Sequence, residues 1–408
     1  MVEFYYKCVD CGKEFDSSKL RYLCDECSNY SKPGTPPKGV LKTVYNFISI
    51  NKTFKQLKKS GFIDIYPIEN SESLPNLRVG QTPMYSITSL DNEKMPFELF
   101  LKDDSQNPTY SFKDRASALV SAYAKEQQIN TIITASTGNA GSSLAGICAA
   151  NNQKAIVMIP ESAPIAKLTQ IIMYGAIIIP VKGSYDDAFD LSVAATEEFG
   201  LYNRNTAFNP LTIEGKKSVA FELFEQLNNS VPDMIFVPVG DGVIISGVYK
   251  GFEDLLMLGI IDKMPKIVAV QAERSDNLTR NLYSVNFKIN ESNTFADSIS
   301  VDIPRNFYMT KEFINLYDGE SITVTDKQIF EASVSLSKNT GLFAEPAAAA
   351  AFAGFLKYGH SEGFGENSKN VVLLTGSGLK DINAVKSIAQ IPKAINPDIN
   401  ELKKILKL

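Results

Sequence analysis

Four cysteines near the amino terminus have the spacing of a tetrahedral metal site. Cys8 and Cys11 form one Cys-x2-Cys pair, and Cys24 and Cys27 form a second pair twelve residues later. Two residues between the thiols allow both sulfurs of a pair to face one ion, and four sulfurs complete a shell that suits zinc. Bound iron, two disulfides and four free thiols are the alternatives. The spacing predicts a structural zinc site, because four thiolates leave no open position for a substrate.

A lysine stands at the predicted start of a helix. Lys113 lies in the segment 108–115, Pro-Thr-Tyr-Ser-Phe-Lys-Asp-Arg. The positive end of a helix dipole favours the neutral amine, and Schiff-base chemistry requires that form. Most lysines are solvated surface charges, so the position alone indicates catalysis only weakly.

Three glycine-containing turns follow predicted strands and could each bind an anion. The first is 136–143, Ser-Thr-Gly-Asn-Ala-Gly-Ser-Ser, and the others lie at 237–244 and 374–381. Backbone N–H groups and hydroxyls at the start of a helix hold carboxylates and phosphates, although a plain capping turn explains each one singly. The carboxyl ends of parallel strands line one crevice. The three turns together therefore predict one anion-binding crevice.

The elements that must position these turns alternate between strands and helices. Short apolar runs rich in β-branched residues predict strands at 131–134, 155–159, 176–180, 234–237, 267–270 and 371–374. Helical stretches are expected at 142–151, 188–199 and 217–227, and a short amphipathic helix at 398–408. Alternation at this spacing predicts an α/β fold with parallel sheets.

Composition excludes several classes of protein. The 408 residues carry 41 Lys+Arg and 46 Asp+Glu, a net charge of −5, which argues against a nucleic-acid partner. A single histidine, His360, cannot build a His-cluster metal site, and we expect it at the surface. Neither a transmembrane run nor a signal peptide is evident, so we expect a cytoplasmic protein with no membrane partner. The fifth cysteine, Cys148, lies in an apolar run and is expected to be a buried, inert thiol.

Taken jointly, these motifs resemble those of the threonine synthases, which belong to the tryptophan-synthase-β type of pyridoxal phosphate enzymes. The resemblance covers roughly residues 80 to 381, and some members carry a four-cysteine ribbon in front. The matching segments are 80–83, 108–115, 136–139, 183–188, 214–217, 345–346 and 375–381. This joint pattern is far more specific than any single motif.

The resemblance implies a role for each cofactor-binding residue. Lys113 would hold pyridoxal phosphate as a Schiff base and then act as general base and acid, and Asn139 would bind the phenolic oxygen of the cofactor. Thr375 would face the pyridine nitrogen. The cofactor phosphate would be held by the backbone of Gly240, Asp241, Gly242, Val243 and Ile244.

The substrate site implied by the resemblance lies at the 136–143 turn and at a second loop. Ser136 and Thr137 would bind the substrate carboxylate at the helix terminus. The full set of substrate-binding residues is Ser136, Thr137, Gly138, Asn205 and Thr206.

The resemblance also implies the architecture. We expect two open, mainly parallel α/β domains, the fold type II of pyridoxal phosphate enzymes, with an N-terminal zinc ribbon. The expected domains are a four-cysteine module at 1–34, a larger cofactor-binding domain at 35–110 and 215–408, and a smaller domain at 111–214. A homodimer acting on a small amino-acid substrate is the expected assembly.

The activity implied is that of threonine synthase, the conversion of O-phosphohomoserine and water to L-threonine and phosphate. The alternative is a related pyridoxal phosphate lyase or β-replacement enzyme, such as a threonine/serine dehydratase or a cysteate-synthase-like enzyme. A third possibility is an inactive paralogue that uses the ribbon as an interaction module. One fold can carry many different activities, so these three hypotheses need separate tests.

Two departures from the family concern the cofactor site. Tyr110 stands where the lysine motif usually has glycine, and the cradle contains Asp241 where the commoner pattern is rich in glycine and asparagine. A carboxylate beside a phosphate is unfavourable unless it points away or pairs with a base.

A third departure concerns the substrate. Thr212 occupies the place where many threonine synthases carry an arginine for the substrate phosphate. Losing a guanidinium removes charge-assisted bonds worth about 1.5–3 kcal/mol. Nearby bases that could compensate are Lys167, Arg204, Lys216 and Lys217.

Overall fold

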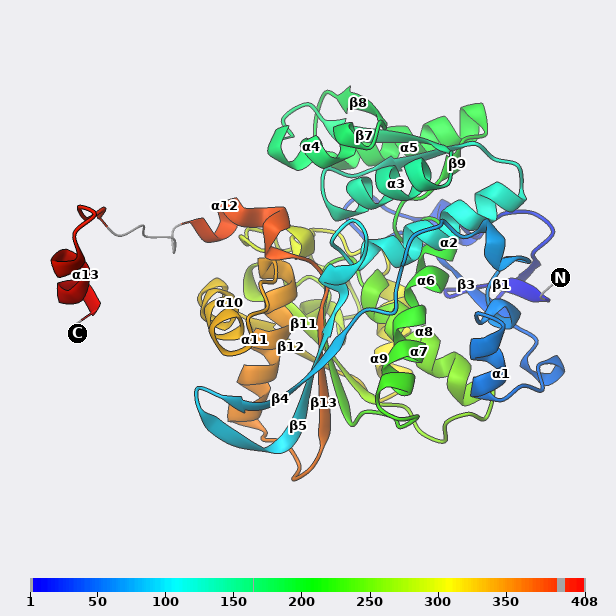
Figure 1. The fold of residues 1–408 in the computed structure, drawn as a ribbon. Helices are drawn as coiled ribbons and strands as arrows, with labels where there is room; N and C mark the ends of the chain where they lie inside the picture. The colour runs from blue at the N-terminus through cyan, green and yellow to red at the C-terminus, as the bar shows by residue number, and fades with distance from the viewer. Residues whose placement is uncertain (1–2, 164, 387–392, 407–408) are drawn as a thin grey trace.

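The strands of the protein form three separate sheets (Figure 1). The computed structural model describes residues 3–163, 165–386 and 393–406. Its strands are β1 (Phe4–Cys8), β2 (Glu14–Asp16), β3 (Leu41–Tyr45), β4 (Met84–Leu90), β5 (Glu93–Asp103), β6 (Thr131–Ala135), β7 (Lys154–Pro160), β8 (Ile177–Val181), β9 (Tyr202–Asn203), β10 (Met234–Pro238), β11 (Lys266–Ala272), β12 (Glu320–Val324) and β13 (Lys369–Leu374). The helices are α1 (Phe54–Lys59), α2 (Lys113–Glu126), α3 (Asn139–Ala150), α4 (Ile165–Met173), α5 (Tyr185–Phe199), α6 (Leu211–Lys216), α7 (Ser218–Gln226), α8 (Val243–Met257), α9 (Phe307–Leu316), α10 (Asp326–Thr340), α11 (Pro346–Ser361), α12 (Ile382–Val385) and α13 (Ile399–Leu406).

The smaller α/β unit contains a parallel sheet of four strands in the order β8-β7-β6-β9. Its central strands are short, apolar and buried on both faces. Ile133 packs in a cluster with Phe189 of α5, whereas Val157 packs in another cluster with Ala145 of α3 and Ile171 of α4. Helices therefore cover both faces of the sheet, as a parallel sheet requires.

The larger unit contains a sheet of six strands in the order β12-β11-β10-β13-β5-β4. All neighbours are parallel except β4, which pairs with β5 in the antiparallel sense. Successive residues of β10 point to opposite faces. Ile235 packs with Val248 of α8, and Phe236 packs with Phe352 of α11. In Figure 1, helices α7 and α8 accordingly lie on one side of this sheet and α10 and α11 on the other.

The amino-terminal cysteine module is an antiparallel sheet in the order β2-β1-β3. Its third strand, β3, lies beyond residue 34, so the sheet extends past the border expected for this module. The Tyr45 hydroxyl donates to Glu214 Oε2 at 2.5 Å, and the Tyr22 hydroxyl accepts a hydrogen bond from the N–H of Asn203 at 2.9 Å. The module is therefore attached to α6 and to the edge strand of the smaller sheet.

The fold class predicted from the sequence is confirmed. Each of the predicted strands coincides with one of β6, β7, β8, β10, β11 and β13, and the predicted helices coincide with α3, α5 and α7. The strands of the two α/β sheets fall within the intervals expected for the two domains, whose borders stay a prediction. The helix expected at 398–408 is α13, except for residues 407–408, which lie outside the described part.

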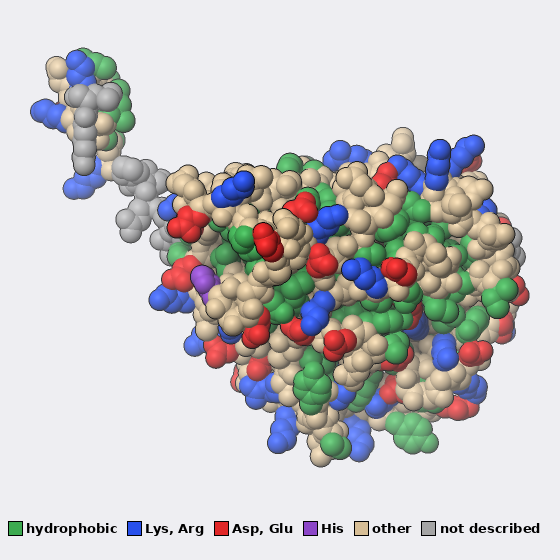
Figure 2. All heavy atoms as spheres, turned by 90° about the horizontal axis from the view of Figure 1, so that it is seen from below, with side chains coloured by type: hydrophobic (Ala, Val, Ile, Leu, Met, Phe, Trp, Pro, Cys, Tyr) green, Lys and Arg blue, Asp and Glu red, His purple; other side chains and the backbone are tan. Residues whose placement is uncertain are grey.

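Charged side chains of both signs are interspersed on the face drawn in Figure 2, in keeping with the small net charge. Helix α13 stands apart from the rest of the molecule in Figure 1. Within the described residues, none of the helices combines the length and the apolar character needed to cross a membrane.

Candidate active site

A cavity of about 470 Å³ lies where the carboxyl ends of β6, β9, β10 and β13 meet. The glycine turns after β6 and β10 line it, together with the residue that follows β13, so the crevice predicted from the sequence exists. The predicted residues that line it are Lys113, Ser136, Thr137, Gly138, Asn139, Thr206, Gly240, Asp241, Gly242, Val243, Ile244 and Thr375.

Lys113 is the first residue of α2 and reaches the cavity. The loop before it is fixed by Asp114, whose carboxylate accepts hydrogen bonds from Thr109 N–H at 2.7 Å and Thr109 Oγ1 at 2.5 Å. Burial and the nearby Arg204 guanidinium lower the pKa of the Lys113 amine to about 8, while Glu345 acts in the opposite direction. The site thus favours the neutral amine that a Schiff-base lysine needs.

Tyr110 adopts the left-handed backbone conformation, with φ of 68°. Its N–H donates to Asn107 O at 2.8 Å and its carbonyl accepts from Ser377 N–H at 3.1 Å. Glycine adopts this conformation without steric cost, which explains the residue that the family usually has here. Two residues later, Phe112 N–H donates to Thr375 O at 2.9 Å, which ties the lysine loop to the end of β13.

The turn after β10 lines the cavity and leads into the start of α8. Gly242 has φ of 86°, and a Cβ atom there would lie 2.3 Å from Thr310 Oγ1, so only glycine fits. Among the described residues, no side chain caps the start of α8, which leaves its first N–H groups available to an anion. The Asp241 carboxylate accepts a hydrogen bond from the backbone N–H of Arg305 at 3.2 Å. The Arg305 guanidinium forms its ion pair with Asp186. Burial lowers the pKa of Arg305, whereas Tyr185 and Asp241 raise it.

Asn139 begins α3 and contacts a carboxylate that received no role from the sequence. Its Nδ2 donates to Glu345 Oε2 at 2.9 Å and to Glu345 Oε1 at 3.1 Å. Glu345 is buried at the start of α11, and burial raises its pKa. Asn139 and Glu345 form one polar unit beside Lys113.

The start of α3 also lines the cavity. Ser136, Thr137 and Gly138 line the cavity there, and no described side chain caps this helix. The N–H of Gly138 donates to Ser136 Oγ at 3.3 Å. Hydroxyls and free N–H groups at a helix start suit a carboxylate.

Asn205 is placed differently from the other predicted substrate residues. It is buried but does not line the cavity. Its Oδ1 accepts from Ala135 N–H at 2.8 Å, and its Nδ2 donates to Ser192 Oγ at 2.6 Å. The amide therefore joins the smaller sheet to α5. Its neighbour Thr206 does reach the cavity.

Several cavity residues carried no recognisable signal in the sequence. Arg204, Arg305 and Tyr185 line the cavity from loops or a helix start. Arg204 follows β9, a strand of two residues that is too short for pattern analysis to detect. Glu345 and Tyr185 lie in the segments 345–346 and 183–188, which match the family pattern, but the pattern gave neither residue a role.

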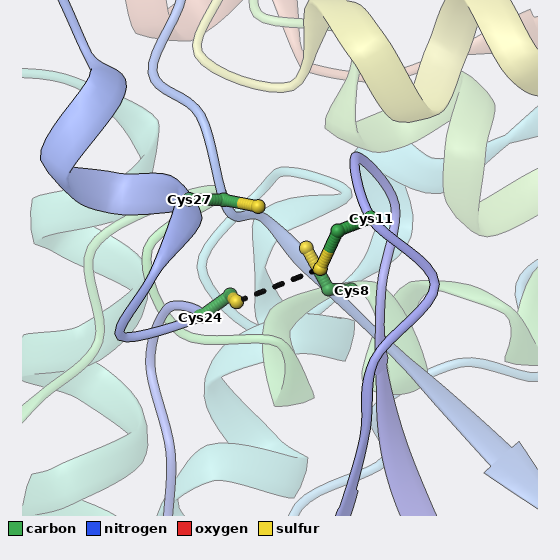
Figure 3. A group of neighbouring side chains, drawn as sticks. All are labelled: Cys8, Cys11, Cys24 and Cys27. Atoms are coloured by element: carbon green, nitrogen blue, oxygen red, sulfur yellow. Dashed lines mark hydrogen bonds between the residues drawn. The ribbon is translucent and has the colours of Figure 1, made fainter.

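The four amino-terminal cysteines converge on one point (Figure 3). Their sulfur atoms all lie within 4.8 Å of one another, and Cys11 Sγ lies 3.9 Å from Cys24 Sγ. Sulfurs around a tetrahedral zinc ion, each about 2.3 Å from the metal, are separated by about 3.8 Å. The cysteines are not disulfide-bonded, and the fifth, Cys148, is buried in α3 as expected.

The sequence profile of the family described as "Pyridoxal-phosphate dependent enzyme" matches residues 76–376. The chain belongs to this family. The matched range includes the lysine loop, the turns that line the cavity and both α/β sheets, and it excludes the cysteine module.

Curated relatives match over nearly the whole chain. Threonine synthase of Methanocaldococcus jannaschii is 34% identical over 412 residues, which cover 98% of this chain and 99% of the relative. Threonine synthase of Methanosarcina acetivorans is 30% identical, covering 99% of this chain and 98% of the relative. Threonine synthase of Halalkalibacterium halodurans is 34% identical, covering 82% and 92%.

Solved structures share the fold at lower identity. The processed form of threonine deaminase isoform 2 from Solanum lycopersicum is 22% identical with a TM-score of 0.67, covering 83% of this chain and 95% of that one. Maize serine racemase is 24% identical with a TM-score of 0.65, covering 83% and 97%. The fold is accordingly that of the fold type II pyridoxal phosphate enzymes.

Proposed function

We propose that this protein is a threonine synthase, a pyridoxal phosphate-dependent lyase that converts O-phosphohomoserine and water to L-threonine and phosphate. The observation that carries the proposal is the match to curated threonine synthases along 98–99% of the chain. It extends beyond the range of the general family profile and includes the cysteine module. The cavity supports it, because Lys113 and two helix starts without a side-chain cap, those of α3 and α8, line the same cavity.

The residues of the cavity fit pyridoxal phosphate. The free N–H groups of the turn 240–244 would hold its phosphate, and Lys113 would hold its aldehyde carbon. Asn139 and Thr375 would hold the two sides of its ring. The bound cofactor supplies an electron sink for charge that develops on the substrate.

The remaining roles belong to the protein. The start of α3, with Ser136 and Thr137, binds the substrate carboxylate and so orients the amino acid. Lys113 Nζ carries protons between substrate carbon atoms, since its pKa of about 8 allows both protonation states near neutral pH. Glu345 holds the Asn139 amide in place.

The second ligand proposed, besides the cofactor, is a structural zinc ion in the cysteine module. Four thiols meet at spacings compatible with a tetrahedral shell. The residues offered are Cys8, Cys11, Cys24 and Cys27. The family resemblance further supports a homodimer, which light scattering on the purified protein tests. A cytoplasmic location is proposed from the sequence.

Purified protein incubated with pyridoxal phosphate and O-phosphohomoserine tests the activity. Equimolar release of phosphate and L-threonine is the expected result. Thr212 gives a specific reason to test a second function, because it is buried and its hydroxyl donates to Asn209 O at 2.8 Å, so it offers the substrate phosphate nothing. Pyruvate from serine or 2-oxobutyrate from threonine, without phosphate release, would identify a dehydratase instead. A protein that stays colourless with the cofactor would be an inactive paralogue.

A further inference from the structure

Two buried cations, of which Arg204 lines the cavity, lack a full set of partners among the described residues. Arg204 and Lys216 are both 0% exposed. Arg204 Nη2 and Lys216 Nζ make no hydrogen bond, and neither side chain has a carboxylate within ion-pair distance in the described part of the chain. A buried cation without a counter-charge is strongly unfavourable. These two side chains are therefore suited to an anion that comes from outside the protein.

Both cations are near Lys113, since the charges of Arg204 and Lys113 act on Lys216 and the charge of Arg204 acts on Lys113. Arg204 lines the cavity, where its Nη1 donates to Thr206 Oγ1 at 3.4 Å. Lys216 ends α6 and packs against α8, since a Cβ atom on Gly247 would lie 2.6 Å from Lys216 Cβ. Burial lowers the pKa of Lys216 well below its usual value, and the neighbouring charges of Arg204 and Lys113 add to this effect. An incoming dianion would oppose it.

The two other bases considered from the sequence either have partners already or lie outside the described residues. Lys217 donates to Glu214 Oε2 at 2.5 Å, to Asp254 Oδ2 at 2.7 Å and to a backbone carbonyl. The side chain of Lys167 lies outside the described residues. Only Arg204 and Lys216 therefore combine complete burial with unused donors, and Arg204 also lines the cavity.

We propose that Arg204 and Lys216 form the subsite for the phosphate group of the substrate, in place of the arginine that many family members carry at the position of Thr212. This inference rests on the proposed function. A phosphomonoester carries a charge near −2 at neutral pH, so it neutralises two cations. A guanidinium can donate two parallel hydrogen bonds to a phosphate, and an ammonium group binds the same phosphate as a compact charge.

Inorganic phosphate titrated into the holoenzyme tests the subsite, because bound cofactor already fills the cradle at 240–244. Calorimetry should detect binding to the wild type, and Lys216→Gln and Arg204→Gln should each weaken it by about 10- to 100-fold. Lys216→Arg should retain affinity within a few-fold. The matched control is Lys266→Gln, which removes a partly exposed lysine at the amino end of β11, where it is paired with Glu320 of β12.

Two further readouts separate this role from a structural one. The visible absorbance of the cofactor and the affinity for L-threonine, which has a carboxylate but no phosphate, should stay within a few-fold of the wild type in both variants. A variant that loses cofactor absorbance or L-threonine affinity to the same extent as phosphate affinity would overturn the subsite. Unchanged phosphate affinity in the variants, or a wild type that does not bind phosphate, would overturn it as well. If Arg204→Gln does not fold, Lys216→Gln and its arginine counterpart decide the question.

The two proposals fail in different ways. A wild type that binds phosphate through these residues yet releases none from O-phosphohomoserine would refute the proposed activity and leave the subsite standing. Normal turnover with an unchanged KM in both variants would refute the subsite and leave the activity standing.

Discussion

Asn139 Nδ2 donates to both carboxylate oxygens of Glu345, at 2.9 and 3.1 Å, beside Lys113. The two residues are 206 positions apart in the chain and come from α3 of the smaller unit and the start of α11 of the larger one. Both side chains are largely buried and line the cavity. The pair therefore fixes the side chain expected to hold the cofactor ring and links the two walls of the cavity.

Replacing Glu345 should reduce activity and cofactor affinity, because it removes the acceptor of the Asn139 amide. Glu345→Ala leaves the Asn139 amide without its acceptor, and hydrogen bonds to charged groups are worth about 1.5–3 kcal/mol. We expect kcat to fall by about tenfold or more, with a weaker affinity for the cofactor. Glu345→Gln keeps an acceptor oxygen and should lose less. Equal activity of the alanine variant and the wild type would contradict this role.

Lys113→Ala should abolish turnover and the visible absorbance of lysine-bound cofactor. General acid–base catalysis alone is worth about 10²- to 10⁴-fold, and the covalent attachment is lost as well. Steady-state kinetics and an absorbance spectrum after reconstitution check the result. Circular dichroism supplies the control for folding. Retained catalysis would refute the role assigned to Lys113.

The rate at which apoenzyme takes up the cofactor should rise with pH and level off above about 8. Only the neutral amine of Lys113 attacks an aldehyde, and the pKa of this amine is lowered to about 8 by burial and by Arg204, while Glu345 raises it. Arg204→Gln removes a positive neighbour and should move the midpoint to higher pH, whereas Glu345→Gln should move it to lower pH. Stopped-flow absorbance between pH 6 and 10 measures the midpoints. A wild-type midpoint near the ordinary lysine value of 10.5 would contradict the prediction.

The sequence predicted the parts of the fold that local pattern encodes. Strands such as β6 and β13 are apolar and β-branched because helices cover both of their faces. Strand β9 was not predicted because it has only two residues, and the pairing of β1 with β3 joins segments on either side of the two cysteine pairs. Strand pairing over such separations has no local signature.

The residues of the candidate site likewise fall into those marked by a local motif and those that only tertiary packing reveals. Turns and motifs marked Lys113, Asn139 and the phosphate cradle, since each lies at an element boundary with a recognisable residue type. Arg204 and Lys216 could be named only as bases near a missing arginine, and their unused donors became evident only from tertiary packing. The placement of Asn205 outside the cavity lining depends in the same way on side-chain contacts that no sequence pattern contains.

Removal of one cysteine of the amino-terminal module should release the proposed zinc ion. Cys24→Ser should reduce the metal-to-protein ratio from about one to near zero and lower Tm by several degrees, because metal binding contributes directly to folding. Elemental analysis and thermal unfolding provide the readouts. Cys148→Ala is the matched control, since this thiol is buried in α3 away from the cluster, and its ratio should stay unchanged. A ratio near zero in freshly purified, reduced wild type would exclude the metal.

Tyr110→Gly should stabilise the protein. Tyr110 holds φ of 68°, a conformation that costs a residue with a Cβ atom about 1–2 kcal/mol, and its side chain is 52% exposed, so little packing is lost. The greater freedom of glycine in the unfolded chain offsets about 0.5–1 kcal/mol of this gain. The net effect should raise Tm by up to about 3 °C.

Tyr110→Ala separates the backbone effect from the loss of the aromatic ring. Alanine keeps the Cβ atom, so the cost of the left-handed conformation remains and Tm should not rise. Both backbone hydrogen bonds of residue 110, to Asn107 and Ser377, persist in either variant and hold the conformation in place. An equal gain from alanine and glycine would show that the ring, rather than the backbone, is the source of the strain.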